Sequence, residues 1–319
     1  GAVVLPSADQ SRRFGGGALL LFFLTAAVGW SGLLSPLSMW AVLLPGVFLF
    51  IAQGRPGITG MAAVVGGAGL LLLPLVLLPP SSRDALIHHL YLPRIWFSTG
   101  GLVRPGWTGF FSYPYLVETF YTIAAGTFGF RLSRMVSFIG FLASVSVAAS
   151  YVKRLSGTRT AVLTVLIMLS IPEMVRNATW SYSDSFLVLF SLLAYLELLR
   201  EDGNPVLAVV WAAGAGCCKY NGLLVLVSVC LLLPFLFRRM SGRTLLLAGV
   251  SLLFISAWWM LPNILQWGNP VYPLLPGVFG TGTSAGARAV AYMNEFGFQG
   301  SPMGVLVPRR LEKKQGKQR

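Results

Sequence analysis

Long apolar segments separated by short polar ones dominate this sequence. Between residues 18 and 262 these segments are roughly 17 to 25 residues long, enough for a helix to cross about 30 Å of hydrocarbon. A helix satisfies its own backbone hydrogen-bonding groups in lipid, so the pattern predicts an all-α fold, a polytopic transmembrane helical bundle. Nine spans are predicted, at about residues 17–34, 38–53, 60–79, 133–152, 160–176, 183–200, 205–218, 221–237 and 245–262.

The composition agrees with a membrane location. Of the 319 residues, 55% are hydrophobic and 11% are charged, a balance that a water-exposed surface does not tolerate. The net charge of +14 lies largely in short loops and a basic tail, where it sets topology and meets anionic lipid, so no nucleic-acid partner is expected. Cys217, Cys218 and Cys230 lack zinc-type spacing and are interpreted as packing residues, and no metal site is predicted from them.

The charged loops decide how the chain is threaded. With Arg12 and Arg13 inside, the later basic loops also fall inside only if the shorter apolar segment 116–129 does not cross. We therefore expect nine crossings plus a half-helix in the outer leaflet, with the loop 80–115 outside. The threading sends Asp84, Glu118, Glu173 and Asp184 to the outer face, and Asp9, Glu197, Glu201 and Asp202 to the inner one.

This threading divides the chain into two regions of different polarity. Residues 1–275 form the predicted transmembrane domain, and residues 276–319 form a polar, basic tail that is too polar to span. The tail would end outside, against the rule that basic residues stay inside. A further helix missing from the C-terminal side would explain this conflict.

The polar stretch 81–102 interrupts the apolar pattern. Pro79 and Pro80 end the third span, Ser81 or Ser82 can cap a new helix, and Asp84 suits its first turn. Regular helical spacing predicts one face of Leu86, Leu90 and Phe97 and another of Asp84, His88 and Tyr91. This describes an amphipathic helix on the outer membrane surface, in which Asp84 could be no more than a cap.

An aromatic segment follows a Gly100-Gly101 turn. It contains Trp107, Phe110, Phe111, Tyr113 and Tyr115. Such residues suit a membrane-interface belt as well as a surface on which a sugar stacks.

Five short motifs then resemble one enzyme class. "DALIHHLYLPR", "YPYLVETFY", "WSYSDSFLVLF", "CCKYNGL" and "GNPVYPLL" are similar, in this order, to motifs of the GT-C class of polyprenyl-phosphate-dependent glycosyltransferases, which includes protein mannosyltransferases and lipid A aminoarabinose transferases. The resemblance covers about residues 60–275. It implies a polyprenyl-phosphate-linked sugar as donor, a glycan, lipid or protein as acceptor, and a site facing outward from a bacterial cytoplasmic membrane.

The resemblance also assigns roles at the outer face. Asp84 matches the acidic residue that acts as general base, which an acceptor hydroxyl needs as it attacks the anomeric carbon. His89 matches the family's histidine and His88 replaces its tyrosine, whereas regular helical spacing puts His88 beside Asp84. Glu118 could bind a divalent metal, raise the pKa of the base, hold an amino group of the acceptor, or merely cap its helix.

Further residues are expected to bind substrate. Tyr113 lies in a segment matching the family's Pro-Pro-Leu-type element. A cation at a membrane edge is costly, so Lys219 is a site candidate, and with Tyr220 and Arg94 it would contact the donor phosphate. Asp184 opens the sixth span, where a carboxylate either binds substrate or simply favours the helix N-terminus.

The chain also departs from the family, whose members usually continue with more spans after the "GNPVYP" turn. Two alternatives from another class are therefore a non-catalytic membrane subunit of a larger complex and a lipid flippase or transporter. An ion-coupled transporter predicts ionisable groups near the bilayer midplane, but the acidic residues here cluster at the predicted membrane edges.

Overall fold

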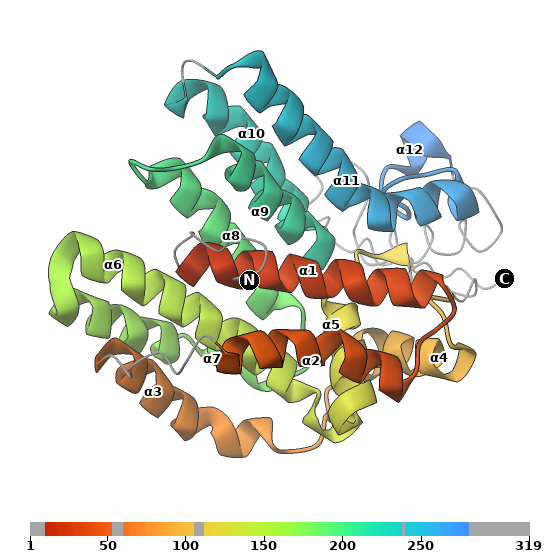
Figure 1. Cartoon of the computed structure of the whole chain (residues 1–319), viewed down its shortest axis with the longest axis horizontal. Helices are drawn as coiled ribbons and strands as arrows, with labels where there is room; N and C mark the ends of the chain where they lie inside the picture. The colour runs from red at the N-terminus through yellow and green to blue at the C-terminus, as the bar shows by residue number, and fades with distance from the viewer. Residues whose placement is uncertain (1–9, 53–59, 105–111, 238–239, 281–319) are drawn as a thin grey trace, which may run out of the picture. The chain divides into compact units, whose positions relative to one another are not determined.

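The computed structural model describes residues 10–52, 60–104, 112–237 and 240–280. The fold is all-α, as predicted, with no β-strand in these ranges. The larger helices are α1 (Gln10–Trp30), α2 (Pro36–Ala52), α3 (Gly60–Val76), α5 (Leu116–Phe128), α6 (Arg134–Ser170), α8 (Asp184–Leu199), α9 (Pro205–Cys218), α10 (Gly222–Leu236) and α11 (Gly242–Trp267) (Figure 1). Shorter elements join them: η1 (Ala85–His89), α4 (Tyr91–Thr99), η3 (Phe130–Leu132), α7 (Pro172–Thr179) and α12 (Pro276–Phe279).

Three helices are long and apolar enough to cross a membrane, namely α1, α6 and α11. The pair α7 and α8, which meet at a bend of 116°, qualifies as a fourth span if counted together. Helices α2, α3, α9 and α10 are apolar but shorter. The structure thus supports three to four membrane-crossing candidates in the described ranges, and the nine crossings remain a prediction.

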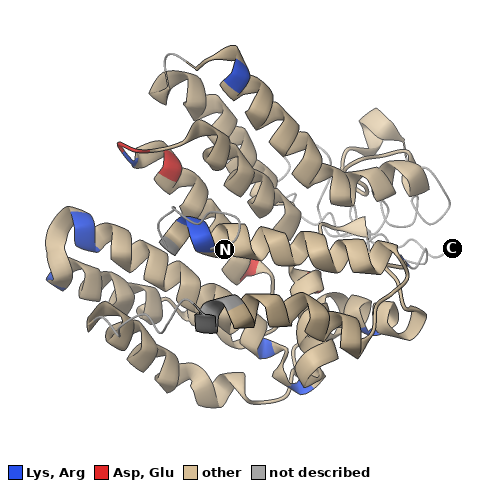
Figure 2. Ribbon diagram, viewed as in Figure 1, with Lys and Arg blue, Asp and Glu red and all other residues tan. Residues whose placement is uncertain are grey.

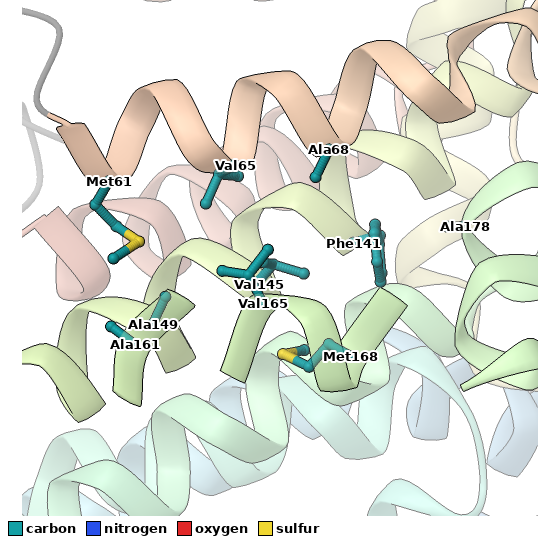
Figure 3. Close-up of a cluster of buried hydrophobic side chains, with 10 residues drawn as sticks. All are labelled: Met61, Val65, Ala68, Phe141, Val145, Ala149, Ala161, Val165, Met168 and Ala178. Carbon is teal, nitrogen blue, oxygen red and sulfur yellow. The ribbon is translucent and has the colours of Figure 1, made fainter. Parts of the chain in front are cut away.

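Helix α6 contains two predicted spans joined at a kink. Gly157 has φ 84° and ψ 178° inside it, a left-handed backbone that favours glycine. The two arms fold back on each other, so that Val145 and Val165 lie in the same buried cluster (Figures 1 and 3). The predicted spans 133–152 and 160–176 are these two arms.

Helix α3 packs across both arms of α6. Met61, Val65 and Ala68 face this cluster, which also contains Ala149 and Ala161 (Figure 3). Lipid tails are as apolar as leucine, so close contact between helices in a membrane depends on small residues that let the backbones approach. The fully buried Ala149 and Ala161 serve this purpose near the kink.

Many large apolar side chains face outward instead of packing. Examples are Leu71, Leu231, Leu253 and Leu265, which are 78%, 65%, 71% and 77% exposed. A water-soluble protein rarely exposes apolar side chains on this scale. These surfaces are consistent with a membrane protein whose helices face lipid.

The chain divides into two compact units, one of residues 1–104 and 114–258 and the other of residues 105–113 and 259–319. In the described part of the second unit, Asn263 donates to the carbonyl of Ser112 at 2.9 Å and Trp267 donates to its hydroxyl at 2.7 Å. Asn269 accepts from the Val271 N–H and donates to the Leu274 carbonyl. The predicted "GNPVYP" turn is therefore confirmed as a hydrogen-bonded turn at the end of α11.

Charged groups of the first unit lie mainly at helix ends (Figure 2). Arg12 at the start of α1 forms a bidentate pair with Glu197 near the end of α8, with 2.7 Å between Nε and Oε1. Lys219 after α9 pairs with Asp184 at the start of α8. We call these the Arg12 end and the Asp184 end; α8 separates them by about 24 Å, given 16 residues at about 1.5 Å each. Asp184 thus lies at one end of α8, and Glu197 and Asp202 lie at the other. That the two ends face opposite sides of a membrane, and which end faces outward, stays a prediction.

Candidate functional site

Arg134, at the start of α6, anchors the polar stretch that follows α3. Its guanidinium donates to the carbonyls of Leu75 and Pro79 at 2.9 and 2.7 Å, and to the Ser81 hydroxyl at 3.1 Å. The last carbonyls of a helix lack partners within the helix, and a cation there is favourable. Sequence reasoning missed Arg134, although an arginine at the predicted outer end of a span runs against the usual charge pattern and was a usable signal.

The stretch then forms a π-helical turn, η1, in place of a regular helix. The Ser82 hydroxyl accepts from the Ala85 N–H at 3.1 Å, which confirms the predicted cap. The Leu90 N–H donates to the Ala85 carbonyl at 2.8 Å, so five residues separate donor and acceptor. Single π turns are rare and often occur at functional sites.

This wide turn makes the predicted helical faces wrong. Leu86 and Leu90 were expected on one apolar face, yet Leu86 is 47% exposed and Leu90 is 5% exposed. The extra residue in the turn rotates everything after it relative to a regular helix. It also changes which histidine can reach a carboxylate.

His89 is the histidine that contacts Glu118. Its Nδ1 lies 2.6 Å from Glu118 Oε1, and the two side chains are 17% and 8% exposed. Its ring lies between those of Tyr121 and Tyr182, with centroids 6.2 and 5.8 Å away. Glu118 does not cap α5, so that alternative is wrong.

Hydroxyl groups tie the surroundings of His89 together. Tyr121 Oη lies 2.6 Å from Ser137 Oγ on α6 and donates to the Tyr182 carbonyl at 2.9 Å. The Tyr182 N–H donates to Ser137 Oγ at 3.0 Å, and Ser82 Oγ donates to Tyr182 Oη at 3.2 Å. None of Tyr121, Ser137 and Tyr182 was predicted as a site residue, although Tyr121 and Tyr182 lie within the motifs "YPYLVETFY" and "WSYSDSFLVLF". Ser137 lies outside all five motifs.

Asp84 and His88 lie next to this pair. Burial lowers the pKa of His88 and the charge of His89 adds to the effect, while Asp84 and Glu118 raise it. His88 is thus a neutral imidazole near pH 7. Asp84 is exposed and forms no hydrogen bond or ion pair within the described ranges. The four predicted catalytic residues, Asp84, His88, His89 and Glu118, therefore interact at one end of the bundle.

Lys219 and Asp184 form a second polar group at this end. The ammonium donates to both carboxylate oxygens, at 3.0 and 3.2 Å, and the side chains are 42% and 26% exposed. The pairing of Lys219 with Asp184 was not predicted from the sequence; it arises because α8 and α9 pack side by side and bring the two together. A cavity of about 30 Å³ adjoins Asp184, lined by Phe141, Ser144, Met174, Asn177, Ser185 and Val188. It has room for one or two waters.

The remaining predicted binding residues are Arg94, Tyr220 and Tyr113. The Arg94 guanidinium lies 5.4 Å from the ring centroid of Phe130 and forms no ion pair in the part of the chain described. Tyr220 is near Arg104; burial lowers the pKa of Arg104, whereas the hydroxyls of Tyr115 and Tyr220 raise it. Tyr113 belongs to the second unit. Their roles in binding stay predictions.

Two smaller expectations need correction. Tyr115, expected in an interface belt or a stacking surface, is 2% exposed, and its ring packs against Trp96 and Arg104. Cys217 and Cys218 are buried as expected, but Cys230 is exposed. Trp107, Phe110, Phe111 and the tail from residue 281 lie outside the described residues.

Few side chains at this site could act as ligands of a divalent metal. Among the described residues there is no group of three His, Cys, Asp or Glu side chains that could hold one. His89 and Glu118 supply at most two ligands, and their nearest atoms already contact each other.

Comparisons with known proteins give no further guide to function. The chain has no match among protein-family models, curated proteins or solved structures. The GT-C resemblance therefore stands on the five motifs alone, and the chemistry must be argued from the side chains.

Proposed function

We propose that the chain is a membrane glycosyltransferase that moves a sugar from a polyprenyl-phosphate donor to an acceptor hydroxyl at the Asp184 end of the bundle. The observation that carries the proposal is the interacting set of Asp84, His88, His89 and Glu118, which joins an exposed carboxylate to a buried histidine–carboxylate contact. A hydroxyl is a poor nucleophile until its proton is removed. This set provides proton acceptors where an acceptor can reach them.

The reaction that suits these groups is a single displacement. The acceptor oxygen would attack the anomeric carbon, and polyprenyl phosphate would leave with the electrons of the broken bond, which inverts the configuration. Lys219 is 42% exposed, so a phosphate can approach its ammonium while Asp184 holds the side chain in place. A fixed cation stabilises the charge that develops on a leaving phosphate.

The outer surfaces of the helices support a lipid-linked donor. Leucines on α3 and α10, such as Leu71 and Leu231, point away from the bundle, so an isoprenoid chain can lie against the helices. The same surfaces would serve membrane lipids and partner subunits. A soluble nucleotide sugar has no lipid chain that could bind to these apolar surfaces.

The proposal predicts that Asp84→Asn abolishes transfer. The purified chain in lipid nanodiscs would be given radiolabelled polyprenyl-phosphate hexoses and pentoses together with a membrane extract as acceptor source. We expect the wild type to consume one donor, and Asp84→Asn to be slower by about 100-fold, because the acceptor hydroxyl loses its hydrogen bond to a charged carboxylate. Asp202→Asn, the same change on a 75% exposed side chain at the Arg12 end, should keep its activity.

Two results would contradict the proposal. A wild-type chain that consumes no donor is not this enzyme. Such a result would favour the alternatives, a non-catalytic subunit of a membrane complex or a lipid flippase. Full activity in Asp84→Asn, with the fold intact, would remove Asp84 from the reacting site and with it the observation that carries the proposal.

A further inference from the structure

We propose that His89, and not Asp84, takes the proton from the acceptor hydroxyl, and that Glu118 positions His89 for this step. The inference rests on the proposed glycosyl transfer and names the base within it. Its first support is the contact of 2.6 Å between His89 Nδ1 and Glu118 Oε1. An ionised carboxylate can only accept hydrogen bonds, so Nδ1 carries the hydrogen and Nε2 keeps a free electron pair.

The ring of His89 is held in one orientation. Tyr121 and Tyr182 flank it, and both are fixed by hydrogen bonds that involve Ser137. The side chain is 17% exposed, which leaves an edge of the ring open to a ligand. A base that is already oriented loses little freedom when the substrate binds.

Glu118 places a buried carboxylate beside His89. The Glu118 side chain is only 8% exposed, and its Oε2 has no hydrogen-bond partner in the part of the chain described. A buried carboxylate with so few partners is costly. When a proton reaches Nε2, the contact becomes a charge-assisted ion pair, which offsets part of that cost.

Asp84 is placed for a different task. It is exposed, and among the residues that the structure describes no hydrogen bond or ion pair fixes its side chain. An exposed carboxylate is a weaker base than an imidazole, whose unperturbed pKa of about 6.5 lies close to the working pH. We assign Asp84 to accepting a hydrogen bond that orients the acceptor.

The step balances as follows. The acceptor O–H proton passes to His89 Nε2 while its oxygen bonds to the anomeric carbon. The bond from that carbon to the phosphate oxygen breaks, and polyprenyl phosphate leaves with the electron pair. The imidazolium, paired with Glu118, then releases its proton to water.

The test is the pH dependence of kcat/KM in nanodiscs. Among the described residues, the titratable groups near His89 are Glu118 and Tyr121 from α5, Tyr182 from the loop before α8, and His88 from its own turn. Asp84 acts on His88. With His89 as base, the wild-type rate should fall as pH drops through the region where an imidazole is protonated. His89→Gln should be slower by about 10² to 10⁴-fold and should lose this acidic limb.

Variants of Glu118 and His88 test the positioning role. Glu118→Gln should move the acidic limb to lower pH as well as slow the reaction, because removing the opposite charge disfavours the imidazolium. Glu118→Asp should restore part of the rate, and exogenous imidazole should restore part of the rate of His89→Ala. His88→Gln should retain the acidic limb. Glu173→Gln, the same change on a 57% exposed side chain, should behave as the wild type.

The outcomes separate the two proposals. If the wild type consumes no donor, the function itself fails. If the wild type transfers sugar and His89→Gln keeps the acidic limb, or Glu118→Gln leaves the limb in place, glycosyl transfer stands and His89 is not the base. Chromatography and melting curves show whether each variant is folded.

Discussion

His88 is a residue whose titration the fold changes in a known direction. Its pKa is lowered chiefly by burial and also by His89, against the opposing effects of Asp84 and Glu118. The unfolded chain therefore binds a proton at this position at a higher pH than the folded chain does. Stability rises with pH wherever the unfolded state holds more protons, so this contribution is present above about pH 6.5 and is lost as pH falls below it.

We predict that His88→Gln flattens the acid side of the stability profile. Between pH 7.5 and pH 5 the melting temperature of the detergent-solubilised wild type should fall more than that of the variant, since glutamine has no proton to gain. At pH 8 the two should respond equally to pH. A variant that loses stability toward pH 5 as steeply as the wild type would show that His88 is not the group responsible.

At the residue scale, the sequence identifies the charged side chains of the candidate site but not the contacts between them. Asp84, His89, Glu118, Asp184 and Lys219 stand out because polar side chains are rare in so apolar a chain. The bond between His89 and Glu118 could not be read from the sequence, since it depends on a π turn that regular spacing does not anticipate. Of the hydroxyl groups around His89, those of Tyr121 and Tyr182 lie within quoted motifs, but nothing in the sequence shows that they meet at His89.

At the scale of elements, apolar run length located the helices well. Predicted spans such as 38–53, 205–218 and 221–237 match α2, α9 and α10 to within two residues. Long apolar runs have few alternatives to a helix in lipid, which explains the agreement. The kink in α6 could be inferred only from the charges around it, because a glycine in a helix more often has no special role.

Gly157 offers a direct test of that kink. Its φ of 84° is unfavourable for any residue with a Cβ, whereas an added Cβ would meet no atom within 4 Å. Gly157→Ala should therefore destabilise the protein by about 1–2 kcal/mol through backbone strain alone. Unfolding by titration with a denaturing detergent measures the difference.

Gly67 in α3 is the matched control. It also has no atom within 4 Å of an added Cβ, but its backbone is helical. Gly67→Ala should be neutral or stabilising by about 0.4–1 kcal/mol, because alanine restricts the unfolded chain. Equal effects of the two changes would mean that the kink at Gly157 does not need a glycine.

For the whole molecule, the two charged ends define a direction across the bundle. Helices α1 and α8 run antiparallel, since Arg12 at the start of α1 pairs with Glu197 near the end of α8. Ser98 on α4 belongs to the Asp184 end, because the Gly100-Gly101 turn that follows it packs on the last turn of α1. Asp202 belongs to the Arg12 end, where it accepts from Arg12.

We predict that these ends lie on opposite sides of a membrane, with the Asp184 end outside. In a Cys230→Ser background, Cys217 and Cys218 remain buried, so a membrane-impermeant maleimide should report on one added cysteine. In intact cells it should label Ser98→Cys at once and Asp202→Cys only after the membrane is opened, since basic residues near Asp202 favour retention inside. Reversed labelling would place the His89 and Glu118 pair in the cytoplasm and remove the external acceptor. Immediate labelling of both cysteines would show that the Asp184 end and the Arg12 end face the same side of the membrane. The site could then not receive a lipid-linked donor from across a bilayer.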